Sequence, residues 1–307
     1  MSSVDVAAAA SKAELSTLQD PQSGTAYSLI APRFGQFDFQ ISGLFGFTGP
    51  GSIVRVREFQ TEGTGLHFSS MDMNTEQMPT IDLRFWFNEV NAVHFRFRYF
   101  NIGGTHFSST PIKFNGAIIP GGRTNNFDSW EWFSGGLYYE RRLTPLYQKY
   151  EGGWPTVLRG WDLRGRIGIE FTYLDFSING GSTPTKLTPG GEETKEDFYH
   201  QSMPLPTIGL EAYRQLSKNF LFQAEVEGNW INRWNSLRNE GGTVWASQNG
   251  IEAHAKLFYS NPSWFGPVQP MIGFFVYTYS QLEDSREDGN FIRWSSYGPE
   301  VGINYSF

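Results

Sequence analysis

Residues 298–307, GPEVGINYSF, decide the fold class expected for this chain. Apolar side chains alternate here with small or polar ones, and a period of two indicates a β-strand with two different faces. One face carries Val301, Ile303, Tyr305 and Phe307, and the other carries Glu300, Gly302, Asn304 and Ser306. The sequence therefore predicts a last strand that separates an apolar from a polar environment.

The sequence stops on the aromatic residue Phe307 without a polar tail, although chain termini are usually solvated and mobile. A closing strand that ends in Phe resembles the C-terminal assembly signal of bacterial outer-membrane β-barrels. In this resemblance the signal comprises Val301, Ile303, Tyr305 and Phe307. It implies that the barrel-assembly machinery recognises the chain.

Composition agrees with a membrane barrel. The chain has 307 residues, of which 39% are hydrophobic and 17% aromatic, and its mean hydropathy is -0.39. No run approaches the roughly 20 apolar residues of a transmembrane helix, so a helical membrane protein is excluded. The aromatic content suits the two interfacial girdles of a membrane barrel. One or two soluble β-domains remain an alternative at this length.

Charge and cysteine content exclude other classes. The net charge of -7 and the pI near 5.3 argue against nucleic acid as a partner. The absence of cysteine excludes a disulfide framework and thiolate metal sites.

Alternating segments recur along the chain with turn-rich gaps, as a meander requires. The predicted strands are 79–87, 93–107, 127–143, 161–176, 205–216, 219–234, 250–259, 267–282 and 291–307. Within Gly35–Ser70 the pattern breaks at Gly49–Gly51, which indicates either one bulged strand or a small hairpin. We expect an all-β, antiparallel up-and-down transmembrane β-barrel over residues 33–307, with about ten strands or alternatively twelve. Both termini are expected in the periplasm, and residues 1–32 as a flexible segment.

Connection lengths alternate, as they do in bacterial barrels with short periplasmic turns and long outer loops. Segments 88–92, 216–219 and 260–266 are short, whereas 108–126, 179–203 and 235–248 are long. The long segment 144–160 is an exception, because it is expected on the periplasmic side.

The polar faces of the strands carry charges of both signs. A soluble sandwich would turn these charges to water, whereas a membrane barrel would turn them to its lumen. The expected lumenal charge network comprises Asp82, Arg84, His94, Arg96, Arg98, Asp162, Arg164, Arg166, Glu170, Glu225, Glu227, Glu252, His254, Lys256 and Glu300. Side chains fill a narrow barrel, and charges removed from water need partners. A closed or very narrow lumen follows.

A longer stretch, residues 63–100, resembles a pattern in an uncharacterised family of small monomeric outer-membrane barrels. Its Gly-Thr start, aspartate-bearing loop, Pro-led strand and His-led strand match Gly63-Thr64, Asp72, Pro79 and His94. Residues 205–227 and 298–307 look like later hairpins of such barrels. The resemblance implies architecture and a bacterial outer-membrane location, but no activity.

No catalytic, cofactor or metal site is predicted. A Gly-x-Ser-x-Gly elbow is absent from the sequence, and His94 and His254 are expected in the charge network. The acidic segments around Asp72 and Glu76 and at 191–197 lack a calcium-ligand register. The first residues also lack the basic and apolar regions of a signal peptide. Either the start is misassigned, or the signal is missing, or the barrel belongs to an organelle.

The sequence favours a structural or surface-binding role through the long outer loops. A narrow porin-like channel for small solutes and a lipid-modifying enzyme are the two alternatives. The expected partners are outer-membrane lipid and lipopolysaccharide, the assembly machinery, and a protein partner at 144–160 or at the outer loops, without nucleic acid.

Overall fold

The computed structural model describes residues 32–57, 62–114, 117–144, 160–179, 185–186, 195–197, 204–236, 244–284 and 289–307. The segment predicted to be flexible, 1–32, lies outside these ranges except for its last residue. Strands dominate the described part, and its helices are the short η1 (Phe68–Met71) and α4 (Pro262–Phe265). None of the helices in these ranges has the length and apolar character needed to cross a membrane.

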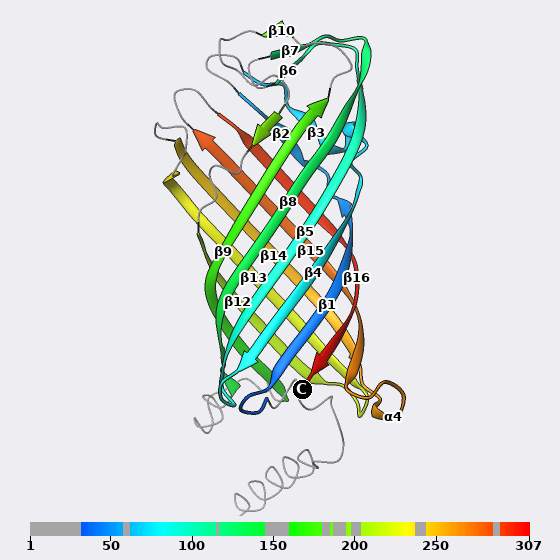
Figure 1. Cartoon of the computed structure of the whole chain (residues 1–307), viewed down its shortest axis with the longest axis vertical. Coiled ribbons are helices and arrows are strands. Elements are labelled where there is room, and N and C mark those ends of the chain that lie inside the picture. The colour runs from blue at the N-terminus through cyan, green and yellow to red at the C-terminus, as the bar shows by residue number, and fades with distance from the viewer. Residues whose placement is uncertain are drawn as a thin grey trace, which may run out of the picture.

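Ten long strands of the described part form a closed antiparallel barrel. They are β1 (Phe37–Thr48), β4 (Thr75–Trp86), β5 (Asn91–Ser108), β8 (Arg123–Arg142), β9 (Trp161–Asn179), β12 (Leu205–Gln215), β13 (Phe220–Ser236), β14 (Val244–Tyr259), β15 (Val268–Asp284) and β16 (Phe291–Ser306). Each strand pairs with the next, and β1 also pairs with β16 (Figure 1). The all-β antiparallel barrel with ten strands is confirmed, and the alternative of twelve strands is wrong.

Short strands are attached to the end of the barrel that carries the long connections (Figure 1). β2 (Ile53–Arg55) pairs with β16 and with β3 (Leu66–His67). β6 (Ile112–Phe114), β7 (Ala117–Ile119) and β10 (Thr185–Lys186) form a separate small sheet, and β11 (Lys195–Asp197) pairs with β9. The ambiguous segment Gly35–Ser70 thus contains one barrel strand followed by a small two-stranded addition.

The two ends of the barrel differ in their connections. At the short-turn end, Asn88 closes one turn, because its Oδ1 accepts from the amides of Val90 and Asn91 at 2.9 and 2.8 Å. Asn261 caps α4 there by accepting from the Ser263 amide at 3.2 Å. At the long-loop end, β13 reaches Ser236 and β14 begins at Val244, so the loop predicted at 235–248 is shorter than expected. Most of the connection predicted at 144–160 lies outside the described residues.

An apolar band surrounds the barrel. Exposed side chains on its outer face include Ile81, Phe95, Phe97, Leu137, Ile167, Ile169, Leu210, Val226, Ile251, Ile272, Phe274, Val276, Val301 and Ile303. Aromatic residues bound this band on three strands, in the pairs Phe37 and Phe47, Phe220 and Trp230, and Tyr297 and Phe307. The members of each pair lie ten residues apart in the sequence, which corresponds to about 25 Å along the axis of a barrel with strands tilted by about 40°. Transmembrane barrels have an apolar band of this height.

Three adjacent strands are the longest of the ten. β5, β8 and β9 contain 18, 20 and 19 residues, whereas β1 contains 12 and β12 contains 11. They extend beyond the other strands at the long-loop end (Figure 1). The barrel therefore carries a projecting wall on one side of its mouth.

Candidate functional site

The interior of the barrel is the candidate functional site, and it consists of two zones. The charged zone lies toward the short-turn end and comprises Asp38, Asp82, Arg84, His94, Arg96, Arg98, Glu140, Arg142, Asp162, Arg164, Arg166, Glu170, Glu211, Glu225, Glu227, Glu252, His254, Lys256 and Glu300. The apolar zone lies toward the long-loop end and comprises Leu44, Val54, Val56, Leu66, Phe68, Met71, Met73, Met78, Phe100, Ile102, Ile112, Phe114, Ile119, Trp132, Leu174, Phe275, Tyr277, Tyr279, Ile292 and Trp294.

Arg166 is a centre of the charged zone. Its guanidinium lies 2.7 Å from Glu211 and also contacts Glu225 and Glu227. The Tyr138 ring supports it, with 5.4 Å between the ring centroid and the guanidinium carbon. Because the side chain is only 1% exposed, its charge is balanced by these carboxylates rather than by water.

Arg96 is a second centre, on β5, which is separated from the Arg166 strand β9 by β8 alone. Its guanidinium nitrogens lie 2.6 Å from Asp82, 2.6 Å from Glu225 and 2.7 Å from Glu252. Arg98 forms a further ion pair with Glu252. Since Glu225 contacts both Arg96 and Arg166, the two centres form one continuous network.

A third group of ion pairs lies nearest the short-turn end. Arg84 is 2.8 Å from Glu140 and 2.9 Å from Glu211. Arg164 is 3.1 Å from Asp162, and its guanidinium stacks on the Tyr213 ring at 4.2 Å. The aromatic ring shields this arginine from water in the same way that Tyr138 shields Arg166.

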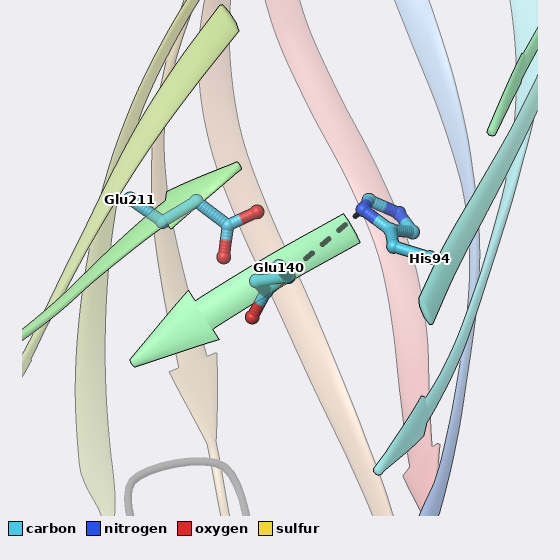
Figure 2. Close-up of side chains that lie close together, drawn as sticks. All are labelled: His94, Glu140 and Glu211. Atoms are coloured by element: carbon cyan, nitrogen blue, oxygen red, sulfur yellow. Dashed lines mark ion pairs between the residues drawn. The ribbon is translucent and has the colours of Figure 1, made fainter. Parts of the chain in front are cut away.

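His94, Glu140 and Glu211 come from three different strands and converge in this part of the lumen (Figure 2). His94 Nε2 is 2.8 Å from Asp82, and its Nδ1 is 4.0 Å from Glu140. Three such side chains could serve as metal ligands. Arg84, however, binds both Glu140 and Glu211, so a guanidinium already neutralises the two carboxylates. The arrangement is therefore that of an ion-pair network.

The seam between the first and last barrel strands carries its own polar cluster. Glu300 accepts from the Ser42 hydroxyl at 3.0 Å and lies 2.8 Å from His254 Nδ1. Lys256 lies 3.5 Å from Glu300 and 3.6 Å from Glu225. Lys256 therefore connects the polar cluster at the seam to the rest of the ion-pair network.

The structure places every residue of the expected network on the inner side of the barrel wall. Glu170 differs from the others, because its partners are the Ser134 hydroxyl and the Asn229 amide rather than an arginine. The prediction missed Asp38, Glu140, Arg142 and Glu211. Alternation could have identified Glu211 in the sequence. It lies between the outward-facing Leu210 and the half-buried Ala212, so the period of two places its side chain on the inner face.

The apolar zone has an aromatic centre. Phe100 lies 4.8 Å from Trp294 and 5.5 Å from Trp132, measured between ring centroids. Tyr277 lies 4.9 Å from Trp294. All four side chains are at most 5% exposed. The strands here carry apolar residues on both faces, so alternation alone does not reveal this zone.

A segment of the chain enters the mouth of the barrel and completes the apolar zone. Leu66, Phe68 and Met71, from β3 and η1, are buried among the wall residues. The Phe68 amide donates to the Ser52 carbonyl at 3.1 Å. At Gly104 in β5, a Cβ atom would overlap the carbonyl oxygen of Met71, so this contact requires glycine. We call residues 52–57 and 62–73 the inner segment.

A cavity bordered by Asp38, Asp82, Arg84, Gln223 and Asn304 has about 20 Å³ of room for the centres of water molecules. This is enough for one or two waters and far too little for a solute.

The remaining sequence-predicted residues lie apart from one another. Glu76 is buried and accepts from Trp294 Nε1 at 3.1 Å, whereas exposed Asp72 accepts from the Thr105 hydroxyl at 3.2 Å. Of the acidic segment 191–197, only 195–197 is described. Val301, Ile303, Tyr305 and Phe307, the expected assembly signal, lie on the outer face, where the Tyr305 and Phe307 rings are 5.2 Å apart.

Searches against protein-family models and curated proteins give no match. Among solved structures, the chain is similar to the outer membrane protein OprG from Pseudomonas aeruginosa, with 11% identity, coverage of 90% of this chain and 97% of that one, and a TM-score of 0.37. It is also similar to the translocator domain of the autotransporter NalP from Neisseria meningitidis (13% identity, 99% and 98% coverage, TM-score 0.40) and to the toluene transporter TodX from Pseudomonas putida (9% identity, 94% and 93% coverage, TM-score 0.31).

The architecture itself carries the assignment. A closed antiparallel sheet leaves no backbone edge exposed to lipid, and the apolar band on its outer face is unsuited to water. The polar side chains lie inside, as they do in transmembrane barrels and not in soluble ones. The outer-membrane location predicted from the sequence is confirmed, and the chain is a ten-stranded transmembrane β-barrel of the outer-membrane type.

Proposed function

We propose that this barrel is a non-enzymatic outer-membrane protein with a closed lumen, which acts through the surfaces that project beyond the membrane. The observation that carries the proposal is the filling of the interior by two unlike zones, one charged and one apolar. Each zone opposes the passage of solutes for its own physical reason.

The charged zone supports closure because its arginines are already engaged. A charged solute would have to replace contacts such as those of Arg166 with Glu211, Glu225 and Glu227. Removing one partner from a buried ion pair costs about 3–5 kcal/mol. The cavity that Glu211 and Glu225 help to line has room for only one or two waters.

The apolar zone supports closure in a different way. The rings of Phe100, Trp132, Tyr277 and Trp294 pack against the inner segment. An apolar constriction expels water, and ions do not cross a dry region readily. A path for ions would require the inner segment to move.

Two observations favour a surface role over catalysis. β5, β8 and β9 extend well beyond the apolar band and present an exposed wall. Inside the barrel, the His94 and His254 rings are bound to Asp82 and Glu300. In the described part of the chain, neither ring bonds to a serine or threonine hydroxyl that it could activate as a nucleophile.

Single-channel recording in planar bilayers tests the closed lumen. The purified chain should give no steady conductance steps once heat-modifiable gel migration has shown that the barrel is folded. A known porin in the same bilayers serves as the positive control. Large, reproducible steps from the folded protein would overturn the proposal and identify a pore.

The narrow channel remains a second candidate because the described part of the inner segment pairs with a barrel strand over a short length. β2 pairs with β16 through three residue pairs, whereas its pairing with β3 lies within the inner segment itself. Displacing this segment would open the apolar zone but leave the charged zone intact. Recording the Gly104→Val variant, which is designed to push η1 from the wall, separates the two candidates. If the variant gives no conductance steps, the closed barrel is supported. Conductance steps that appear only in the variant support a gated channel.

A further inference from the structure

Three exposed arginines occupy one sector of the outer surface at the long-loop end. They are Arg55 on β2, Arg233 on β13 and Arg293 on β16. The strand register links them through a row of paired residues that runs from Ser247 through Leu282 and Phe291 to Arg55. The Arg233 amide donates to the Ser247 hydroxyl at 3.0 Å at one end of this row. We call this surface the basic sector.

The backbone holds Arg233 in an unusual conformation. Its φ of 47° lies in the left-handed region, which bulky residues with a Cβ atom adopt rarely. A β-bulge between Ile231 and Trp234 accompanies it. The bulge directs the side chain to the outer face, where the guanidinium lies 5.4 Å from the centroid of the Trp245 ring. Such strain is commonly kept where a side chain has a role.

Arg293 is held in a similar way. Its guanidinium lies 5.5 Å from the centroid of the Phe291 ring. Stacking on an aromatic face orients an arginine and leaves the N–H groups at its edge available for an acceptor. Both arginines are therefore prepared for an external partner.

The described residues of the sector carry an excess of positive charge. Among the residues that the structure describes, no carboxylate lies within ion-pair distance of Arg55, Arg233 or Arg293. On the same face, the carboxylate of Asp284 lies 3.6 Å from Arg57. An anionic partner would meet this surface without displacing an existing ion pair of the three arginines.

The height of the basic sector matches that of a lipid headgroup. Arg233 lies three residues beyond Trp230, and Arg293 lies four residues beyond Tyr297 toward the same end. Trp230 and Tyr297 mark the edge of the apolar band, so Arg233 and Arg293 lie about 10 Å above it. Aromatic belts lie at the boundary between acyl chains and headgroups. With the long-loop end outside, this is the outer leaflet.

We propose that the basic sector binds the headgroup of an outer-leaflet lipid that carries more than one phosphate. Guanidinium groups form paired hydrogen bonds with phosphate oxygens. Arg233 and Arg55 are separated by four strand spacings, or about 19 Å, so their anionic partners are separate phosphates. Exposed Leu282 and half-buried Phe291 lie between them in the same row of paired residues.

The opposite end of the barrel provides a matched control. The Arg214 guanidinium lies 5.5 Å from the centroid of the Trp161 ring near the short-turn end. It has the same chemistry and a similar aromatic support, but it faces the other leaflet. A variant at this position tests whether any exposed arginine produces the effect.

The experiment measures lipid binding to the purified full chain by native mass spectrometry. The probes are diphosphoryl lipid A, monophosphoryl lipid A, phosphatidylethanolamine and inorganic phosphate. We expect diphosphoryl lipid A to bind most tightly. Arg233→Ala and Arg293→Ala should each weaken it about ten-fold or more, because each removes a charge-assisted contact. Arg214→Ala should leave binding unchanged.

Arg233→Gly accompanies Arg233→Ala, since glycine accepts a positive φ and preserves the bulge. Heat-modifiable migration establishes that each variant is folded. Equal binding by the Arg233, Arg293 and Arg214 variants would overturn the proposal, as would equal binding of phosphatidylethanolamine. Occupancy by inorganic phosphate without a preference for lipid A would also overturn it and indicate a free-phosphate site. These outcomes do not depend on whether the lumen conducts.

Discussion

The charged zone and the apolar zone occupy the same barrel, yet they depend on their residues in opposite ways. Ion pairs such as Arg166 with Glu211 are directional, and a buried charge that loses its partner remains uncompensated. The rings around Phe100 pack without strict direction, so neighbouring side chains can partly fill a gap. One zone should therefore be sensitive to the identity of single residues, and the other to the volume they fill.

The largest expected effect comes from Arg166→Met. This change leaves Glu211, Glu225 and Glu227 without one of their guanidinium partners in a buried site. We expect a loss of about 5 kcal/mol in the free energy of unfolding, the upper end of the range for a broken buried pair. Urea titration of the refolded barrel in detergent, followed by heat-modifiable migration, measures it. Arg214→Met, at an exposed arginine, should change stability by less than about 0.5 kcal/mol. Equal losses in the two variants would contradict a special role for the buried network.

Phe100→Ala tests the apolar zone with a slightly smaller expected effect. Removing this ring takes away contacts with Trp132 and Trp294, and we expect a loss of about 4 kcal/mol. Phe100→Leu should recover much of the lost stability, because leucine restores most of the apolar volume that packs at this position. The same urea titration gives both values. If the leucine variant were no more stable than the alanine variant, the zone would depend on aromatic identity, as the charged zone depends on charge.

Gly104→Val should have an intermediate effect. Its side chain overlaps the Met71 carbonyl and displaces η1, which costs about 1–3 kcal/mol as overpacking. The barrel strands should remain paired, so limited proteolysis should cut only near the inner segment. Gly122→Ala provides a comparison at a glycine with open space around it, although its φ of 76° adds some strain. Proteolysis across the barrel strands would show instead that the inner segment is needed for the whole wall.

The smallest expected effect is that of Tyr138→Phe. The hydroxyl donates one hydrogen bond to Glu227 at 3.3 Å, while the ring that supports Arg166 remains. We expect a loss of about 1 kcal/mol, near the typical value for one hydrogen bond. Tyr139→Phe, on the outer face, is the neighbouring control. A loss close to that of Arg166→Met would mean that the network fails as a unit when any member is changed.

Much of the fold could be predicted from alternation. The inward side of strands such as β9 and β14 carries charges in the sequence, and the polar and apolar faces followed from the period of two. Closure required a further step, because the same alternation suits a soluble sandwich. The absence of free edges and the height of the apolar band, both visible only in three dimensions, distinguish the two.

The apolar zone could not be predicted in the same way. Phe100 and Trp132 are apolar residues that face inward, so a rule that assigns apolar residues to lipid misplaces them. They are buried because the inner segment, distant in the sequence from both, enters the mouth of the barrel. The ion-pair partners also depend on which strands face each other across the lumen. Arg84 forms an ion pair with Glu211, which is 127 residues away in the sequence, and no local sequence pattern predicts this contact.

The pairing of β1 with β16 has a consequence for how the chain folds. β1 has a complete set of backbone partners only after the last strand has been made, and Ser42 meets Glu300 across 258 residues. Contacts between such distant residues make folding slow, because the entropy of a long loop is lost before the contact forms. Until then both edges of the growing sheet are able to pair with other chains. Closure of this barrel must therefore wait until β16 has been made, with aggregation prevented in the interval.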